Sequence, residues 1–195
     1  MTRRGYWTTD SEFDAAHSLV AAADFIELAG RRPHYWKWFV LALHSALQGA
    51  LTLALHNDNA VLVQKPGVSK KMLAAFAGEQ DFPLPYMDNF RSLYGKAQDS
   101  ENLRQGAISL PISPQHTRAM EALDELRDEF THFNQKTWSI ERAMLVECPL
   151  VACEVLRHLL ETSNAIRWRQ AGLMAKAVRA LDRVEGALRK MANTA

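Results

Sequence analysis

Eighteen consecutive residues without a formal charge decide the fold of this chain: WFVLALHSALQGALTLAL, residues 38–55. A run of that length must be considered as a membrane span. Five small residues dilute its hydrophobicity, no second run of this kind occurs, and four polar side chains interrupt it: His44, Ser45, Gln48 and Thr52. We therefore interpret the segment as the central helix of a soluble bundle, apolar on nearly all sides because neighbours surround it, and we expect no membrane contact.

Helical patterns continue on both sides of this segment. Thr9 and Glu12 have the spacing of a capping box, and Ser113 before Pro114 marks another helix start. The sequence predicts a single domain over residues 1–195, an all-α bundle of five to seven helices. Apolar and polar residues alternate in 108–112, so this segment could form a minor strand pair with 61–63. The expected helical ranges are 9–30, 33–56, 69–77, 86–97, 114–135, 140–163 and 170–191.

Composition excludes several classes of function. Lys and Arg number 23 against 22 Asp and Glu, so a net charge of +1 rules out a polycation that coats nucleic acid. Cys148 and Cys153 do not form a C-x-x-C pair, and we interpret them as buried thiols in a reducing cytosol. No apolar stretch follows Arg3 and Arg4 to make a secretory signal, so we expect a cytoplasmic protein.

Common catalytic motifs are absent: the phosphate loop G-x-x-x-x-G-K-S/T, G-x-G-x-x-G, H-E-x-x-H and G-x-S-x-G. Glu154, His158 and Glu161 share one helix face and define one hypothesis, a metal-dependent enzyme. Their order is the reverse of the E-x-x-H motif that di-iron bundles take from two helices. We therefore expect neither a metal nor a cofactor.

A sharper signal lies in ELRDEFTHF, residues 125–133, where Arg127 and Asp128 precede His132. Metal-free RNA cleavage needs a base for the ribose 2′-hydroxyl, and histidine titrates near neutrality. It also needs a cation for the charge that develops on the phosphate, and arginine matches phosphate geometry. Asp128 lies four residues before His132, so it could orient the imidazole. The alternative interpretation is an exposed helix whose charges flank an apolar stripe.

The spacing of Arg127 and His132 also restricts how their two side chains can reach one site. Five residues at about 100° each place the two side chains roughly 140° apart on an ideal helix. They can serve one site only if the helix ends or kinks between them, or if two copies of the chain face each other across a two-fold axis. We expect a homodimer, in which one histidine acts as base and the other as acid.

The motif resembles the signature of the HEPN superfamily of small all-α domains, in which arginine and a polar residue precede histidine near a helix end. Residues 126–141 (LRDEFTHFNQKTWSIE) and 43–55 (LHSALQGALTLAL) are similar to uncharacterised bacterial HEPN-like proteins. This resemblance implies a dimeric, metal-independent endoribonuclease with Arg127 and His132 as the catalytic pair and Asp128 beside them. Other members of the superfamily do not cut RNA, which leaves a second hypothesis: a dimeric module that binds a nucleotide or a protein partner, such as an antitoxin.

Two further patterns bear on an RNA ligand. A polar line on the apolar central segment either is hydrogen-bonded between helices or lines a groove; it comprises His44, Gln48, Thr52 and His56. A basic strip near the C-terminus either is a solvated face or tracks phosphates; it comprises Lys176, Arg179, Arg183 and Lys190. Trp138 and Trp168 either stack on bases or anchor the core. We expect His17 to be a solvated surface residue.

Overall fold

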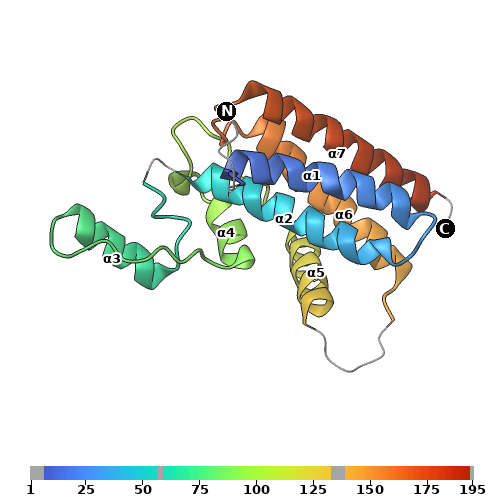
Figure 1. The fold of residues 1–195 in the computed structure, drawn as a ribbon, viewed down its shortest axis with the longest axis horizontal. Coiled ribbons are helices and arrows are strands. Elements are labelled where there is room, and N and C mark those ends of the chain that lie inside the picture. Colours follow the sequence, from blue (N-terminus) through green and yellow to red (C-terminus); the bar gives the residue numbers. More distant parts are fainter. Residues whose placement is uncertain (1–6, 57–58, 133–138, 194–195) are drawn as a thin grey trace.

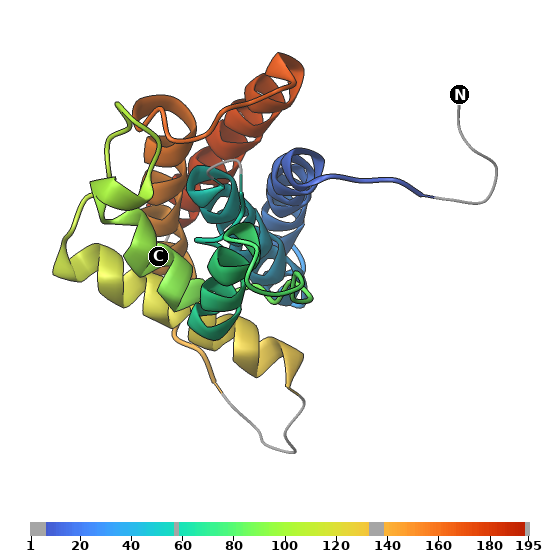
Figure 2. The ribbon, with the colours of Figure 1, turned by 90° about the vertical axis from the view of Figure 1, so that its left-hand side faces the viewer.

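A computed structural model describes residues 7–56, 59–132 and 139–193. Within those ranges the chain is an all-α bundle, as the sequence predicts. Figure 1 shows α1, α2, α6 and α7 running along the long axis, and Figure 2 shows α5 lying across them. The elements are α1 (Ser11–Ala29), α2 (Tyr35–Leu55), α3 (Pro66–Phe76), α4 (Phe90–Ala97), the 3₁₀ turn η1 (Ser100–Asn102), α5 (Pro114–Thr131), α6 (Arg142–Arg157), the π turn η2 (His158–Thr162) and α7 (Ala171–Ala192).

Helix α2 is the centre of the bundle. It packs against α1, α4, α5 and α6, and its buried face includes Phe39, Leu43, Leu47 and Leu51. Among the described helices it is the one long and apolar enough to cross a membrane, judged by length and composition alone. In this structure the rest of the chain buries 56% of its apolar 18-residue stretch. The interpretation of α2 as a core helix agrees with that burial.

Helices α1 and α2 approach closely at Gly49. A Cβ at this position would lie 2.8 Å from the Cβ of Ala15, closer than real Cβ atoms come. Glycine in a helix costs roughly 1 kcal/mol relative to alanine, so the close approach explains why this residue type suits the position. An apolar stripe of α1 is buried in the bundle, and it includes Ala15, Leu19 and Ile26.

The start of α1 differs from the predicted capping box. Asp10 is the N-cap instead of Thr9, and its side chain accepts a first-turn backbone N–H at 2.8 Å. Glu12 is 2% exposed and reaches the start of α7. Its carboxylate accepts the backbone N–H groups of Arg169 (3.1 Å) and Gln170 (3.3 Å). The prediction was wrong because the free N–H groups at the start of another helix compete for the same carboxylate.

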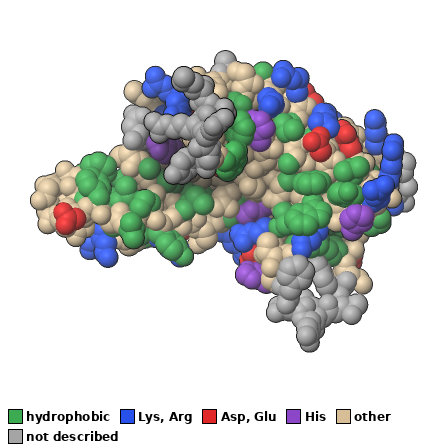
Figure 3. All heavy atoms as spheres, viewed as in Figure 1, with side chains coloured by type: hydrophobic (Ala, Val, Ile, Leu, Met, Phe, Trp, Pro, Cys, Tyr) green, Lys and Arg blue, Asp and Glu red, His purple; other side chains and the backbone are tan. Residues whose placement is uncertain are grey.

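Residues 59–89 form an arm beside the bundle, with α3 at its far end (Figure 1). Helix α3 begins at Pro66 instead of Ser69, because the Ser69 hydroxyl donates to the carbonyl of Val61 (2.8 Å) and so does not cap a helix. Ala75 is the residue that α3 buries. Apolar side chains gather in patches on the face of the arm that Figure 3 shows, and the exposed large ones are Leu73, Phe76, Phe82, Leu84, Tyr86 and Met87.

The minor strand pair weighed for 61–63 and 108–112 is not formed, and the described part of the chain contains no strand. Gln64 makes one isolated antiparallel bridge, with Met87. The N–H of Ile108 donates to the carbonyl of Ser163 at 2.8 Å, so the alternating segment pairs with the end of η2. Of its alternating apolar residues only Leu110 is buried, while Ile108 and Ile112 are exposed.

The helix expected over 140–163 appears as α6 followed by η2. Pro149 lies inside α6 and is buried. The π turn closes with the N–H of Ser163 donating to the carbonyl of His158 at 2.7 Å. It leads into a short loop that connects to α7 at one end of α2.

Candidate functional site

Helix α5 ends between the two residues of the predicted catalytic pair. Its last residue is Thr131, and His132 is the C-cap with an extended backbone (φ −97°, ψ 97°). The Thr131 hydroxyl contacts the carbonyls of Arg127 (3.0 Å) and Asp128 (3.1 Å), which are among the last of the helix. The N–H of His132 still donates to the carbonyl of Asp128 at 2.8 Å, so the helical spacing continues up to His132 and changes only at this residue. His132 is exposed, and the next six residues, 133–138, lie outside the described ranges.

Two carboxylates of the same helix hold Arg127. Its Nη2 lies 3.2 Å from Asp124 Oδ1, and its Nη1 lies 2.6 Å from Asp128 Oδ1. The side chain is 32% exposed, and its Nε is buried without a hydrogen-bond partner among the described residues. The guanidinium is thus fixed in place while one face remains accessible.

Asp128 has a different neighbour from the one that the sequence predicts. We expected its carboxylate to orient the imidazole of His132, but in this structure it pairs with Arg127. The link that the structure gives between Asp128 and His132 is a backbone hydrogen bond of 2.8 Å. An adjacent guanidinium competes with an imidazole for a carboxylate, because it is always charged.

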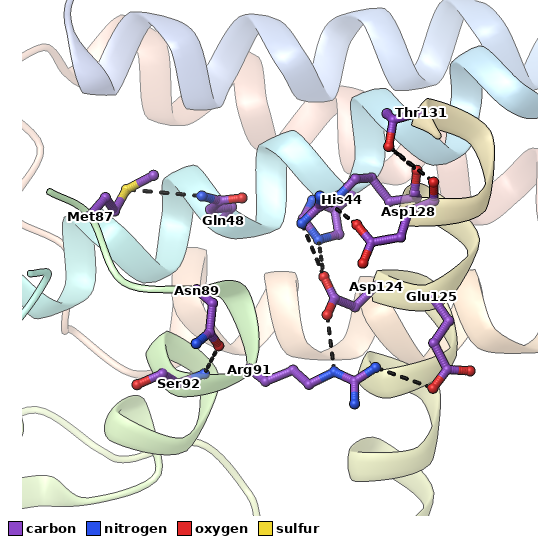
Figure 4. Close-up of polar contacts among 11 residues, drawn as sticks. His44, Gln48, Met87, Asn89, Arg91, Ser92, Asp124, Glu125, Asp128 and Thr131 are labelled. Carbon is purple, nitrogen blue, oxygen red and sulfur yellow. Dashed lines mark hydrogen bonds and ion pairs between the residues drawn. The ribbon is translucent and has the colours of Figure 1, made fainter. Parts of the chain in front are cut away.

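Asp124 joins three helices. Its Oδ1 lies 3.0 Å from Nε2 of His44 in α2, and its Oδ2 accepts from Nε of Arg91 in α4 at 3.0 Å. Its side chain is 12% exposed. Figure 4 shows the Asp124 carboxylate between His44 and Arg91, with Glu125 on the far side of the Arg91 guanidinium. We call the group of His44, Arg91, Asp124, Arg127 and Asp128 the Asp124 cluster.

His44 is a neutral donor in this cluster. Burial lowers its pKa, and the positive charge of Arg127 lowers it further, while the hydrogen bond to Asp124 opposes both effects. Because a carboxylate only accepts, Nε2 carries the proton. The ring also lies against Phe90, with 4.3 Å between ring centroids. A buried imidazole held in this way cannot exchange protons readily with a ligand outside.

The rest of the predicted polar line does not extend the cluster into one groove. Gln48 and Thr52 donate to the sulfur of Met87 at 3.9 and 3.7 Å. His56 is exposed at the far end of α2 and lines a separate hollow. His44 thus makes a contact between helices, whereas Gln48 and Thr52 contact Met87 in the segment before α4.

The predicted basic strip on α7 faces α1 at two of its four positions. Arg183 pairs with Asp24 (2.8 Å) and Glu27 (2.9 Å). Lys176 donates to Nε2 of His17 at 3.0 Å, and the other ring nitrogen of His17 donates to a backbone carbonyl at 2.9 Å. His17 is therefore not the solvated residue that we expected. Arg183 and Lys176 thus stabilise the contact between α7 and α1, which weakens the case for binding of phosphates along this strip. Arg179 and Lys190 are exposed.

The three residues of the metal hypothesis have other neighbours. Glu154 lies 3.4 Å from Nε2 of His116, His158 contacts the carbonyl of Ile108 at 3.3 Å, and Glu161 pairs with Arg157. No group of three metal-ligating side chains occurs within the described ranges.

Two tryptophans were candidates for base stacking. Trp168 is half-buried against the core, which favours the anchor interpretation. Trp138 lies outside the described residues. The two cysteines are free, and burial raises the pKa of both thiols.

The sequence did not lead us to predict Asp124 and Arg91 as residues of this site. Asp124 stands three residues before Arg127, a spacing that allows contact on a helix, so this partner could have been found. Nothing in the sequence indicates that Arg91, thirty-three residues earlier, reaches the same carboxylate. Comparison with known proteins adds no assignment, since no family model, curated protein or solved structure matches the chain.

Proposed function

We propose that this chain is a HEPN-like, metal-independent endoribonuclease that acts as a homodimer. The observation that supports it best is the end of α5 at Thr131, which leaves His132 exposed five residues after a guanidinium that two carboxylates hold in place. Electrostatic stabilisation is most effective when the charged group is already in place before the reaction. Asp124 and Asp128 supply that restraint to Arg127.

The proposed reaction needs two proton transfers. A base removes the proton of the 2′-hydroxyl, the 2′-oxygen bonds to the adjacent phosphorus, and the bond from phosphorus to the 5′-oxygen breaks as an acid protonates that oxygen. The products are a 2′,3′-cyclic phosphate and a 5′-hydroxyl. Arg127 offsets the charge that develops on the phosphate oxygens, and His132 transfers protons.

A second copy of the chain supplies the second imidazole in this proposal. The other imidazole of the Asp124 cluster, His44, is buried and hydrogen-bonded, so it is a poor proton carrier. Pairing of two chains about a two-fold axis brings two copies of His132 to one cleft, one as base and one as acid.

The test is incubation of purified protein with mixed RNA in EDTA, followed by end-group analysis. We expect 2′,3′-cyclic phosphate ends with the unmodified protein, and a loss of cleavage of at least 100-fold in His132→Ala and Arg127→Ala. His34→Ala is the matched control, because His34 is also exposed but lies at the start of α2. Cleavage that survives both substitutions would remove the assignment.

A second candidate function is a non-catalytic dimeric module that binds a protein partner. The observation in its favour is that Arg127 is already paired with carboxylates of its own chain, while the arm over residues 59–89 exposes apolar side chains. This second function predicts that RNA stays intact and that His132→Ala leaves partner binding unchanged. The same set of variants therefore separates the two candidates.

A further inference from the structure

A hollow of about 640 Å³ lies at the far end of α2 from the Asp124 cluster. The start of α1, the end of α2 and the loop before α7 enclose it, and its lining includes Leu53, His56, Arg104, Arg167 and Arg169. His56 follows His44 by twelve residues, which is about 18 Å along a helix. The hollow is thus separate from the proposed nuclease site.

The three arginines of the hollow are not equivalent. Arg169 is neutralised, because its guanidinium lies 2.8 Å from Glu12 and 3.6 Å from Asp10. Arg104 and Arg167 form no ion pair with any carboxylate in the described ranges of the chain. The hollow therefore holds two positive charges that the described side chains do not offset.

Arg104 is also held in place. One of its terminal nitrogens donates to the side-chain oxygen of Asn164 at 2.5 Å, and its Nε is buried without a hydrogen-bond partner among the described residues. Asn164 has a positive φ of 52°, a conformation that asparagine tolerates. The preceding Ser163 is fully buried, and its hydroxyl accepts the N–H of Ala165 at 3.1 Å. A braced turn thus positions Arg104 and begins the loop that carries Arg167.

We propose that this hollow binds a small ligand that carries a phosphate monoester. Such a group has a charge of about −1.5 to −2 at pH 7, which matches the two free guanidiniums better than the single charge of a phosphodiester. Its volume falls in the range of small-molecule sites, roughly 300–1,000 Å³. Leu53 and Ala165 offer an apolar wall for the organic part of the ligand, and His56 offers a further donor.

Calorimetric titration at constant ionic strength tests the proposal, with inorganic phosphate and ribose 5-phosphate as probes. We expect saturable binding of one molecule per chain, with ribose 5-phosphate binding at least as tightly as phosphate. Arg167→Gln should weaken both at least tenfold, and it should not disturb folding, because Arg167 is exposed and pairs with no carboxylate in the described ranges. Arg118→Gln, which removes an exposed arginine of α5, should change affinity less than twofold.

Three results would overturn the assignment: no saturable binding, an equal loss in Arg167→Gln and Arg118→Gln, or displacement of ribose 5-phosphate by an RNA oligonucleotide without terminal phosphates. The last result would identify the hollow as an RNA-backbone contact. Binding that is the same in His132→Ala as in the unmodified protein would show that the hollow works independently of the proposed nuclease.

Discussion

At the scale of single residues, Asp124 is the most constrained side chain of the candidate site. Its two oxygens serve His44, Arg91 and Arg127, which come from three different helices. A nearly buried carboxylate is tolerable only where hydrogen bonds and opposite charges compensate its lost hydration. Removing its charge would leave Arg127 with Asp128 and Arg91 with Glu125 as their carboxylate partners.

We predict that Asp124→Asn lowers the free energy of unfolding by about 1–3 kcal/mol, the cost of a buried polar group that loses part of its hydrogen bonding. Asp128→Asn is the matched control: its side chain also pairs with Arg127, but it is 52% exposed. Solvent screens such a pair, so this change should cost less than about 1 kcal/mol. Urea denaturation of the two variants measures the difference, and equal losses would contradict the role assigned to Asp124.

His44 makes stability depend on pH in a defined direction. Its pKa in the folded protein lies below the usual value of 6.5, and the charged groups that face it are Arg127, Asp124 and Asp128. Above pH 6.5 His44 is mostly neutral in both the folded and the unfolded chain, so its titration takes nothing from the stability of the fold there. As pH falls further, the unfolded chain binds a proton that the folded chain resists, and stability is lost.

We predict that His44→Gln flattens the decline in unfolding free energy between pH 7 and pH 5, because glutamine can donate to Asp124 without titrating. His34→Gln should leave that decline unchanged, since His34 is exposed. Urea denaturation at several pH values gives the two slopes. Identical slopes for His44→Gln and the unmodified protein would show that His44 does not control this part of the curve.

The sequence identified part of this site and missed the rest for a physical reason. Arg127, Asp128 and His132 lie within six residues, so local spacing was enough to select them. Local spacing could not show that Asp128 pairs with Arg127, nor that Arg91 and His44 converge on Asp124. Such convergence depends on how helices cross, which the pattern of one chain does not contain.

At the scale of elements, apolar periodicity predicted the helices well and their ends less well. Periodicity reports the face that a helix buries, and it located α1, α2, α5 and α7. Helix ends depend on single hydrogen bonds that other segments can claim. Glu12 illustrates this, because its carboxylate binds the start of α7 instead of its own helix.

The contact between α1 and α2 provides a test at this scale. Gly49→Ala would place a Cβ 2.8 Å from the Cβ of Ala15, so the helices must move apart. We predict a loss of about 1–3 kcal/mol, the usual cost of overpacking, despite the better helix propensity of alanine. The double variant Gly49→Ala, Ala15→Gly should recover part of the loss by removing the opposing methyl group. Thermal unfolding measures both, and a more stable single variant would refute the close approach.

At the scale of the whole molecule, the proposed chemistry requires more than one chain. A single chain offers one exposed imidazole near the end of α5, that of His132, while His44 is hydrogen-bonded to Asp124. Two proton transfers with one accessible imidazole would be slow, and the proposed two-fold dimer would supply the second imidazole. The proposed activity should therefore depend on protein concentration, even though the fold of each chain should not.

We predict that cleavage per chain falls on dilution in step with dissociation of the dimer, measured by analytical ultracentrifugation over the same concentrations. Mixing Arg127→Ala with unmodified protein should give mixed dimers that stay partly active, because they keep two imidazoles and one guanidinium in the shared cleft. Mixing His132→Ala with unmodified protein should give mixed dimers with a single imidazole and little activity. Each variant alone lacks both copies of one group and should stay inactive. Constant cleavage per chain at concentrations where the protein sediments as a monomer would place both proton transfers within one chain and refute the dimeric mechanism.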